Sequence, residues 1–403
     1  MSQPTVPAVE RPSGRVVDTL VIGGGLLGSA VAYYLAQAGS SVLLAEKDQI
    51  NRQASGQNAG SLHFQLEYRM IENGLEAARK AAEAMPLHLH AQQAWAGLEQ
   101  ELGSPLGVVQ HGGFMVAETP EQVERLGRKV ELEQASGLVT ELLDGDEVRR
   151  RAPYLGQSIL AAAFCPTEGK ADPRRCALAY ANASARLGAE LRTACGVTAL
   201  ARTAQGWNAT LEDGSACRAA TVVIAAGAWS GRVAQMAGTV LPVSPVGLTM
   251  TATARSAPLL SHLVQHAGRR LSMKQTGEGN VLIGGGWPAR LHQEHGVVDL
   301  ERKPELLLSS LAGNMAAAAS VVPGVAHLPV LRVWTGMTAL VADQLPLIGE
   351  VPRAPGAFIA TGGSAFTLGP TYARVLADKV LGRPAAFDVS RYDPNRFASL
   401  TFA

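Results

Sequence analysis

The feature that most constrains this chain is an uncharged stretch near its N-terminus, residues 19–45, which is interrupted by glycines. As one continuous helix it would be long enough to cross a bilayer. However, an apolar run leads directly into Gly23 to Gly25, and Gly39 interrupts the far end. Glycines in series mark tight turns and weaken a helix. The stretch therefore predicts no membrane span but a βαβ unit, with a strand over 16–22, a helix over 26–38 and a strand over 41–45.

Within this unit the glycines follow the spacing Gly-x-Gly-x-x-Gly between the first strand and the helix. In this pattern the first glycine permits a tight turn, the second lets a pyrophosphate approach the backbone, and the third lets the helix pack on the strand. An acid at the end of the second strand accepts hydrogen bonds from a ribose and disfavours NADP. These residues predict a dinucleotide site at Gly23, Gly25, Gly28 and Glu46. The pattern does not distinguish NAD from FAD, and the alternative is that the glycines form only a tight turn.

Two further glycine-rich segments bear on the choice of dinucleotide. The loop over 52–60, RQASGQNAG, can place backbone N–H groups and hydroxyls along a second phosphate and the edge of a ring. An ordinary polar loop would have the same composition. Near the C-terminus, Gly362 and Gly363 precede an expected helix over 371–381. The free N–H groups of such a helix start would stabilise negative charge on a reduced flavin, unless the turn is simply a glycine-rich helix start.

Composition excludes several classes of protein. With 403 residues, 47% of them hydrophobic and 17% charged, the chain predicts a globular protein of roughly two or three domains. The net charge of +1 predicts neither nucleic acid nor an anionic membrane as a partner. The four cysteines form no C-x-x-C pair, so we expect no metal site in this chain and buried free thiols in a reducing cytoplasm. Residues 1–15 lack a signal peptide's apolar segment and are expected to be a disordered tail, which also favours the cytoplasm.

The middle of the chain predicts a second set of strands. Residues 107–117 suggest a hairpin or strand pair, and Thr119 followed by Pro120 predicts the start of a helix. Residues 241–297 read as strands with a turn at 277–280, and residues 300–319 read as mainly helical.

Several separated segments together resemble one family, the FAD-dependent oxidoreductases of the D-amino-acid oxidase, glycine oxidase and sarcosine oxidase superfamily. The fingerprint through Lys47 and the loop ending at Gly60 resemble that family's ADP and flavin loops. The resemblance runs in order from about residue 16 to residue 383, which makes it more specific than any single motif. The remaining segments that carry it are Asp172-Pro173, 222–230, 241–245, 332–336, 343–349 and 360–370.

The resemblance implies an α/β fold in two interleaved parts. One is a Rossmann-like FAD-binding domain with a parallel sheet, and the other is a smaller α+β substrate domain with a mixed or antiparallel sheet. The expected FAD-binding segments are 16–85, 150–240 and 330–400, and the expected substrate segments are 86–149 and 241–329.

The family likeness also implies which residues hold the cofactor. No His or Cys lies within residues 54–60, so the FAD is expected to be held non-covalently, with attachment at His63 only a remote alternative. The implied FAD contacts are Gly23, Gly25, Leu27, Gly28, Glu46, Lys47, Ser55, Gly56, Gln57, Asn58, Ala59, Val197, Ala226, Gly227, Trp229, Gly362, Gly363, Phe366 and Thr367.

The chemistry implied by the resemblance is oxidation of a C–N bond: an amino acid, imino acid or secondary amine gives a hydride to flavin N5, and the imine formed is hydrolysed. Many relatives that oxidise amino acids have an Arg two residues after the glycine of a Trp-x-Gly motif, where it pairs with the substrate carboxylate. Here that position is Thr338, so another basic residue is expected to bind the carboxylate, or the substrate is held differently. The candidate catalytic residues are His63, Lys274, Arg332 and Thr338, and the candidate substrate contacts are Arg69 and Ser364.

Two alternatives to a self-sufficient flavoenzyme stay open from the sequence. One is a flavin-holding subunit of a multi-subunit amine or opine dehydrogenase, which would act with a partner that carries an iron–sulfur cluster. The other is a nicotinamide-dependent dehydrogenase, which leaves the 52–60 loop unexplained. A small-molecule amine or amino acid is the expected ligand in the leading hypothesis, and homo-oligomers are also compatible with it.

Overall fold

The structure, a computed structural model, describes residues 14–398. The predicted tail over 1–15 therefore lies outside the described residues, apart from its last two. Of these, Arg15 already belongs to the first strand.

The predicted βαβ unit is confirmed. Strand β1 (Arg15–Ile22), helix α1 (Leu26–Gln37) and strand β2 (Val42–Ala45) follow one another, and the two strands pair in parallel. Gly23 has a φ of +110°, a conformation that side chains with a Cβ rarely adopt. A Cβ at Gly28 would collide with the Gly23 carbonyl oxygen, so helix and strand can pack this closely only with glycine there.

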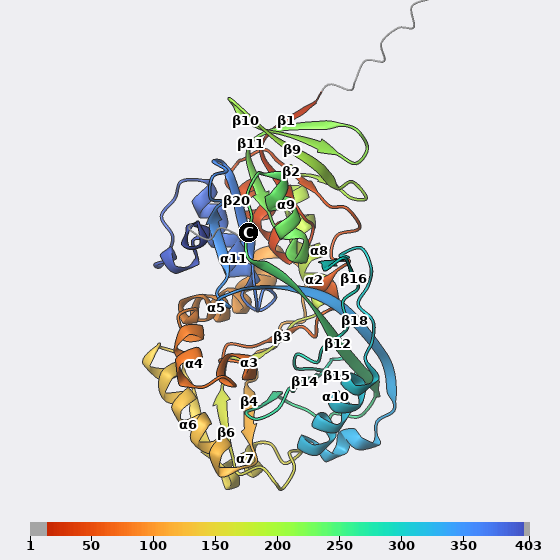
Figure 1. Cartoon of the computed structure of the whole chain (residues 1–403). Coiled ribbons are helices and arrows are strands. Elements are labelled where there is room, and N and C mark those ends of the chain that lie inside the picture. The colour runs from red at the N-terminus through yellow and green to blue at the C-terminus, as the bar shows by residue number, and fades with distance from the viewer. Residues whose placement is uncertain (1–13, 399–403) are drawn as a thin grey trace, which may run out of the picture.

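This unit forms the centre of an eight-stranded sheet, drawn in the upper part of Figure 1. Its central strands pair in parallel, whereas β19 pairs antiparallel at one edge and the β9–β10 ribbon pairs antiparallel with β11. The order is β19-β20-β11-β1-β2-β8, in which the new strands are β8 (Glu190–Arg192), β9 (Val197–Thr203), β10 (Gly206–Leu211), β11 (Ala216–Ile224), β19 (Leu347–Glu350) and β20 (Ala357–Thr361).

Both faces of the first sheet are covered, because its strand residues alternate between two apolar clusters. Val21 and Val223 pack into one cluster with α1, whereas Leu20 and Val222 pack into the other with Val233 of α9. Helix α1 contacts both α8 and α11, and α11 contacts α5. These helices are α5 (Met85–Leu102), α8 (Pro173–Arg186), α9 (Ser230–Met236) and α11 (Gly369–Val380).

A second eight-stranded sheet lies in the lower part of the molecule, and its long strands β12 and β18 extend up towards the first part (Figure 1). Neighbours are antiparallel except for β13 and β4. The order is β18-β12-β15-β14-β13-β4-β6-β5, with β4 (Gly113–Ala117), β5 (Glu141–Asp144), β6 (Ala161–Cys165), β12 (Val243–Arg255), β13 (Leu263–His266), β14 (Ser272–Gln275), β15 (Asn280–Gly284) and β18 (Val330–Val341).

The two faces of the second sheet have different surroundings. Phe114, Met273 and Ile283 point into an apolar cluster with α7 (Gly145–Arg151) and α10 (Leu308–Val321). On the other face, Met115 packs with Leu126 of α6 (Pro120–Ala135). Helix α6 contacts β4, β5 and β6.

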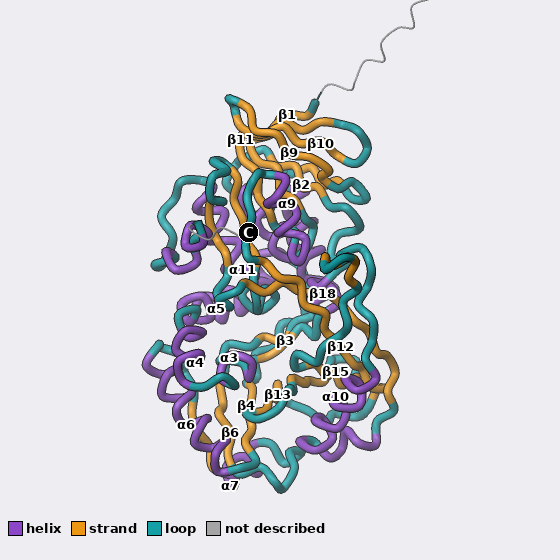
Figure 2. Tube along the Cα trace, in the orientation of Figure 1, coloured by secondary structure: helices purple, strands orange, loops and turns teal. Residues whose placement is uncertain are grey.

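Short elements complete the described chain, and Figure 2 shows how loops connect the helices and strands. No helix within residues 14–398 is both long and apolar enough to cross a membrane. The short elements are α2 (Ala54–Gln57), α3 (Tyr68–Ile71), α4 (Leu75–Ala82), β3 (Ser61–Leu62), β7 (Gly169–Lys170), β16 (Gln293–Glu294), β17 (Val297–Val298), η1 (Gly227–Trp229), η2 (Pro323–His327), η3 (Ser390–Tyr392) and η4 (Pro394–Phe397).

Three details differ from the sequence predictions. The hairpin over 107–117 is wrong, because β4 is a single strand there, paired with the distant β13 and β6. The helix expected over 300–319 begins later, at Leu308. Strands β6 and β18 belong to the second sheet, although the predicted boundaries placed 150–240 and 330–400 with the cofactor domain. The division into two discontinuous domains stays a proposal, with its boundaries moved at these two strands.

Candidate functional site

The turn between β1 and α1 forms a cradle of backbone N–H groups. Oε2 of Glu46 accepts a hydrogen bond from the Gly24 N–H at 2.6 Å, and Oε1 accepts from the Asp48 N–H at 2.8 Å. The carboxylate is thus held at the end of β2 while its oxygens retain lone pairs for a ligand. Helix α1 begins at Leu26; its N-cap residue Gly25 has no side chain to cap it, and its first turn holds no acid. Its N-terminus is therefore suited to an anion.

The loop over 52–60 lies against this cradle. Oγ of Ser55 accepts a hydrogen bond from the Leu26 N–H at 2.9 Å, so the loop and the start of α1 are joined. Asn58 closes the loop on itself, because its Oδ1 accepts from the Gly60 N–H at 2.6 Å. The Gln57 carbonyl accepts from the Trp334 indole N–H at 2.7 Å, which fastens the loop to β18 of the second sheet.

A cluster of charges surrounds the predicted cofactor residues Lys47 and Trp229. Lys47 Nζ lies 4.0 Å from the Trp229 ring centroid and 2.6 Å from Oε2 of Glu301. The Trp229 indole donates to Oε1 of Glu301 at 3.0 Å. Sequence reasoning missed Glu301, since it is far away in the chain and no local motif marks it. Val197, also predicted to contact the cofactor, directly follows the loop whose Cys195 N–H donates to the Glu46 carbonyl.

The C-terminal turn, residues 362–368 between β20 and α11, lies next to the segment that follows the 52–60 loop. Gly362 has a φ of +142° and Ser364 a φ of +53°. Thr367 Oγ1 donates to the Ser61 carbonyl at 3.1 Å, and the Trp95 indole donates to the Thr367 carbonyl at 2.6 Å. The ring of Phe366 lies 5.4 Å from that of Trp95. A Cβ at Gly369, the first residue of α11, would press on Leu26 at 2.7 Å, so the N-termini of α11 and α1 lie together.

One face of the second sheet is turned towards the loop and the C-terminal turn. Along β18, residues at even positions share this face: Trp334 and Gly336 lie against Gln57, and Leu340 lies against Gly363. Thr338 falls between these contacts on the same face, because side chains two residues apart point the same way. The register extends this face across β12, β15 and β14 to Val246, Leu248, Met250, Leu282, Ser272 and Lys274.

Arg69 follows the 52–60 loop and is fixed by three side chains. Its guanidinium donates to Ser364 Oγ at 2.8 Å, to Glu67 Oε1 at 3.3 Å and to Gln344 Oε1 at 3.1 Å. Although burial raises the pKa of Glu67, the charge of Arg69 and the Ser364 hydroxyl outweigh it and lower the pKa to about 2. Arg69 keeps 28% of its side chain exposed.

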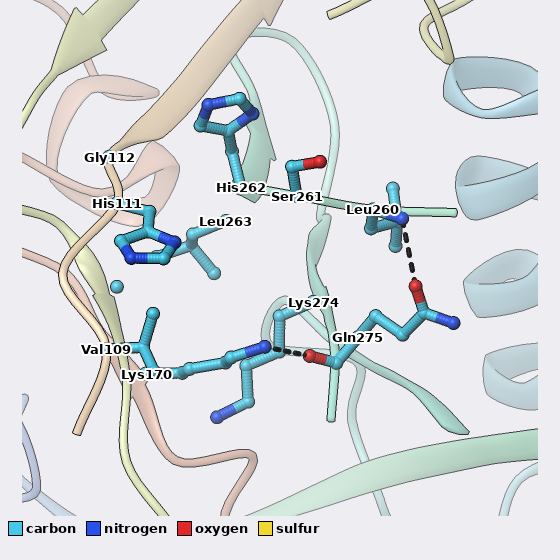
Figure 3. Close-up of a pocket in the computed structure, with 11 residues that line it drawn as sticks. Val109, His111, Gly112, Lys170, Leu260, Ser261, His262, Leu263, Lys274 and Gln275 are labelled. Atoms are coloured by element: carbon cyan, nitrogen blue, oxygen red, sulfur yellow. Dashed lines mark hydrogen bonds between the residues drawn. The ribbon is translucent and has the colours of Figure 1, made fainter. Parts of the chain in front are cut away.

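Lys274 is buried on the same face of β14 as Ser272. Its Nζ has the Ala171 carbonyl at 3.4 Å, and a Cβ at Gly60 would lie 2.9 Å from that Nζ. Figure 3 shows Lys274 and Lys170 lining a small pocket, to which His111 and His262 also contribute. Burial, together with the neighbouring charge of Lys170, lowers the pKa of Lys274 well below its usual value.

His63 lies beside this face with only 8% of its surface exposed. Its Nε2 is 2.9 Å from Ser272 Oγ, while its buried Nδ1 has no partner among the described residues. Burial lowers the pKa of His63 from its usual value, which favours the neutral imidazole. Ser272 was not predicted from sequence, because its role depends on the register of β14.

Arg332 is the one candidate catalytic residue that the structure places at the solvent end of this face. It is exposed, and its guanidinium lies 5.5 Å from the Trp334 ring centroid. The described residues thus bring together His63, Arg69, Thr338, Ser364 and Lys274 around the loop and the C-terminal turn, with Arg332 at the periphery.

These residues fit an FAD molecule. The uncapped start of α1 suits a pyrophosphate, and the fixed Glu46 carboxylate suits a ribose. The position of a Cβ on Gly227 has nothing within 4 Å, so the turn after β11 leaves open space beside the cradle. The second sheet presents a buried amine, a hydroxyl and apolar side chains to the same region, as expected around a flavin ring.

Comparison with known proteins identifies the family. The chain is similar to one of the subunits of opine oxidase from Rhizobium meliloti, with 27% identity over 94% of this chain and 98% of that protein. It is equally similar to glycine oxidase of Geobacillus kaustophilus, with 27% identity over 94% and 97% of the two chains. The crystal structure of glycine oxidase from Geobacillus kaustophilus matches with a TM-score of 0.82 and 25% identity, over 95% of this chain and 99% of that one.

The family described as FAD dependent oxidoreductase (DAO) matches residues 18–379, which include the cradle, the 52–60 loop and the C-terminal turn. This match decides between the two dinucleotides that the fingerprint left open. The chain belongs to this family of FAD-dependent oxidoreductases.

Proposed function

We propose that this enzyme oxidises a C–N bond in an amino acid, imino acid or secondary amine that carries a carboxylate. Bound FAD would supply the acceptor for the hydride on the carbon next to nitrogen, and water would hydrolyse the imine product. Glycine oxidase and the opine oxidase subunit, to which the chain is similar over nearly their whole length, support this class of substrate by their names.

The observation that carries the proposal is the fixed guanidinium of Arg69 beside Gly363 and Ser364. A Cβ at Gly363 would lie 3.2 Å from Arg69, so the arginine reaches the turn that faces the flavin site. Its contacts with Glu67, Ser364 and Gln344 hold it in one orientation. A guanidinium has five N–H groups, so these three contacts leave others to donate to a carboxylate. Arg69 can therefore supply the clamp that Thr338 does not.

The rest of the pocket is suited to an amine with an apolar or N-substituted part. Val246, Leu248 and Met250 present an apolar wall on β12, and Thr338 adds only a short hydroxyl. Such a wall excludes water and orients the reacting C–H bond. Because burial favours the neutral form of Lys274, its Nζ can accept a proton and so favour the neutral substrate amine that gives up a hydride.

An anaerobic assay of the purified holoenzyme tests this function. The flavin absorbance is followed while glycine, D- and L-proline, N-methyl amino acids and opines are added in turn. Bleaching by at least one of these carboxylate-bearing amines is expected, and amines without a carboxylate should bleach more weakly. If no member of the panel reduces the flavin, self-sufficient amine oxidation is overturned.

A second candidate is the flavin-holding component of a multi-subunit dehydrogenase. It is favoured by the similarity to the opine oxidase subunit, a protein named as one part of an assembly. Tandem purification from the native host separates the two candidates, because a stable partner that is required for flavin bleaching would favour the multi-subunit enzyme.

A cytoplasmic location remains part of the proposal, supported by the four buried, unpaired cysteines.

A further inference from the structure

The segment that carries the carboxylate clamp has an unusual backbone. Residues 63–66, between β3 and α3, are buried but belong to no helix or strand. Buried backbone N–H groups outside regular structure need partners from elsewhere, because a buried donor left unpaired destabilises the fold. Here the partners are side chains from distant parts of the fold.

Glu168, a fully buried carboxyl just before β7, takes two of these four backbone donors. Its Oε1 accepts from the backbone N–H groups of both Phe64 and Gln65 at 3.0 Å. Its Oε2 accepts from the Gln65 side-chain amide at 3.0 Å. One side chain, over a hundred residues away in sequence, therefore fixes two successive peptide units and one side chain of the segment.

Helix α6 completes the arrangement with a buried ion pair. Lys129 Nζ lies 2.7 Å from Oε1 of Glu133, and it also donates to Oε1 of Gln65 at 2.9 Å. Glu133 Oε1 accepts from the Leu66 N–H at 2.7 Å. A buried network in which each member is paired is rigid, whereas the loss of one member leaves others unpaired.

The surroundings are shaped for this carboxyl. A Cβ at Gly113, the first residue of β4, would collide with Oε2 of Glu168, so glycine is required where the carboxyl passes. The Gly113 carbonyl accepts the other N–H of the Gln65 amide at 3.2 Å. From α5, His88 Nδ1 lies 3.0 Å from the Phe64 carbonyl oxygen. The segment is thus held by donors and acceptors on several elements.

We propose that Glu168 is a positioning residue for substrate binding: by holding the backbone of Phe64 and Gln65 it places Glu67 and Arg69, which follow directly, against the C-terminal turn. Glu168 does not touch the proposed substrate site itself. The part of this inference that concerns substrate rests on the proposed function, in which Arg69 binds the carboxylate.

The test compares Glu168→Gln with Glu131→Gln in the FAD-loaded full chain. Glu131 lies on α6 between Lys129 and Glu133 but is exposed, so its variant is a matched control. In Glu168→Gln the new side-chain N–H group faces the N–H group of the Gln65 amide. Two donors cannot bond to each other, so the Gln65 amide loses an acceptor. If Glu168→Gln does not fold, Glu168→Asp takes its place in the test, because the shorter side chain withdraws the same acceptor oxygens by one methylene group.

Two measurements decide the outcome. Hydrogen–deuterium exchange of peptides covering 61–70 should become at least about tenfold faster in Glu168→Gln, while peptides of α1 and β1 and the flavin content stay as in the control. With the substrate found in the amine panel, KM should rise about 10- to 100-fold, with a smaller change in kcat. Unchanged exchange in 61–70, or a uniform rise throughout the chain, overturns the proposal.

The exchange measurement does not depend on a substrate. If exchange changes as expected but no panel amine bleaches the flavin, the positioning of the segment stands and the proposed function fails. If a substrate is found and its KM is unchanged despite faster exchange, the link to substrate binding is overturned.

Discussion

Single glycines in the cofactor cradle serve different purposes, and only the structure separates them. A Cβ at Gly28 would strike the backbone of Gly23, so that glycine is needed for packing within the protein. A Cβ at Gly25 would meet only Ser55 Oγ, at 2.9 Å. Because a Cβ there would displace only the end of a side chain and no backbone, we expect a ligand, as in the fingerprint, to be the main reason for glycine at this position.

The substitution Gly25→Val should abolish FAD retention while the protein still folds. Its methyl groups would fill the position of the pyrophosphate at the start of α1. The ratio of flavin to protein absorbance after purification measures retention, and circular dichroism reports folding. Gly97→Val is the control, since Gly97 is an exposed residue of α5 with open space around it. Equal flavin content in both variants would refute the placement of the pyrophosphate.

Arg69→Lys should raise KM for a carboxylate-bearing substrate by about 30- to 100-fold, with FAD content unchanged. Lysine keeps the charge but loses the planar fork that Glu67, Ser364 and Gln344 hold in place, and charge-assisted pairs contribute about 2–3 kcal/mol. Steady-state kinetics of Arg69→Lys measure the effect. The control is Arg79→Lys, since Arg79 is an exposed residue of α4. An unchanged KM would place the carboxylate elsewhere.

At the scale of elements, the helix starts fall into two kinds. Helices α6, α7 and α8 begin with side-chain caps from Thr119, Asp144 and Asp172. Helix α1 has no such cap, although it is buried along nearly its whole length. The sequence predicted the capped start of α6 correctly, because capping is a local interaction. It failed for the 107–117 hairpin, because the partners of β4 are distant.

Asp172→Ala should lower the free energy of unfolding by about 1 kcal/mol, through loss of the N-cap of α8. Burial raises the pKa of Asp172, but its hydrogen bonds with Arg174 outweigh this and the net shift is downward. A lowered folded-state pKa means that this stabilisation is present above the unfolded pKa of about 3.9 and is lost as pH falls through the folded value.

Denaturant titrations of wild type and Asp172→Ala at pH 7 and at progressively lower pH check both points. The difference between the two proteins should be largest near neutral pH and shrink in acid. A difference that grows as pH falls would contradict the sign of the shift.

At the scale of the whole molecule, the predicted cofactor site is assembled from segments that lie far apart in the chain. The turn after β1, the 52–60 loop, η1 and the C-terminal turn surround one region, and the second sheet closes it through the contact of Gln57 with Trp334. Since FAD would touch all of these parts, it should stabilise the molecule as a unit.

Removal of FAD should therefore lower Tm by several degrees, and adding FAD back should restore it. A ligand at 100 times its Kd stabilises by about 2.7 kcal/mol, provided that it binds only the folded state. Differential scanning calorimetry of apo and reconstituted protein tests this, with Gly25→Val as the control that should not respond to added FAD. Identical Tm values for the apo and reconstituted wild type would contradict a cofactor bound across these segments.

The sequence by itself determined the βαβ unit, the dinucleotide fingerprint and the family likeness, because each depends on residues close together in the chain or on motifs in a fixed order. Only the tertiary structure decided that β6 and β18 join the second sheet, that Thr338 shares the face of β18 that lies against the 52–60 loop, and that Arg332 lies at the periphery. It also brought Glu168 to the segment that precedes Arg69. Strand pairing and burial of charge depend on contacts between residues far apart in sequence, and no local pattern records them.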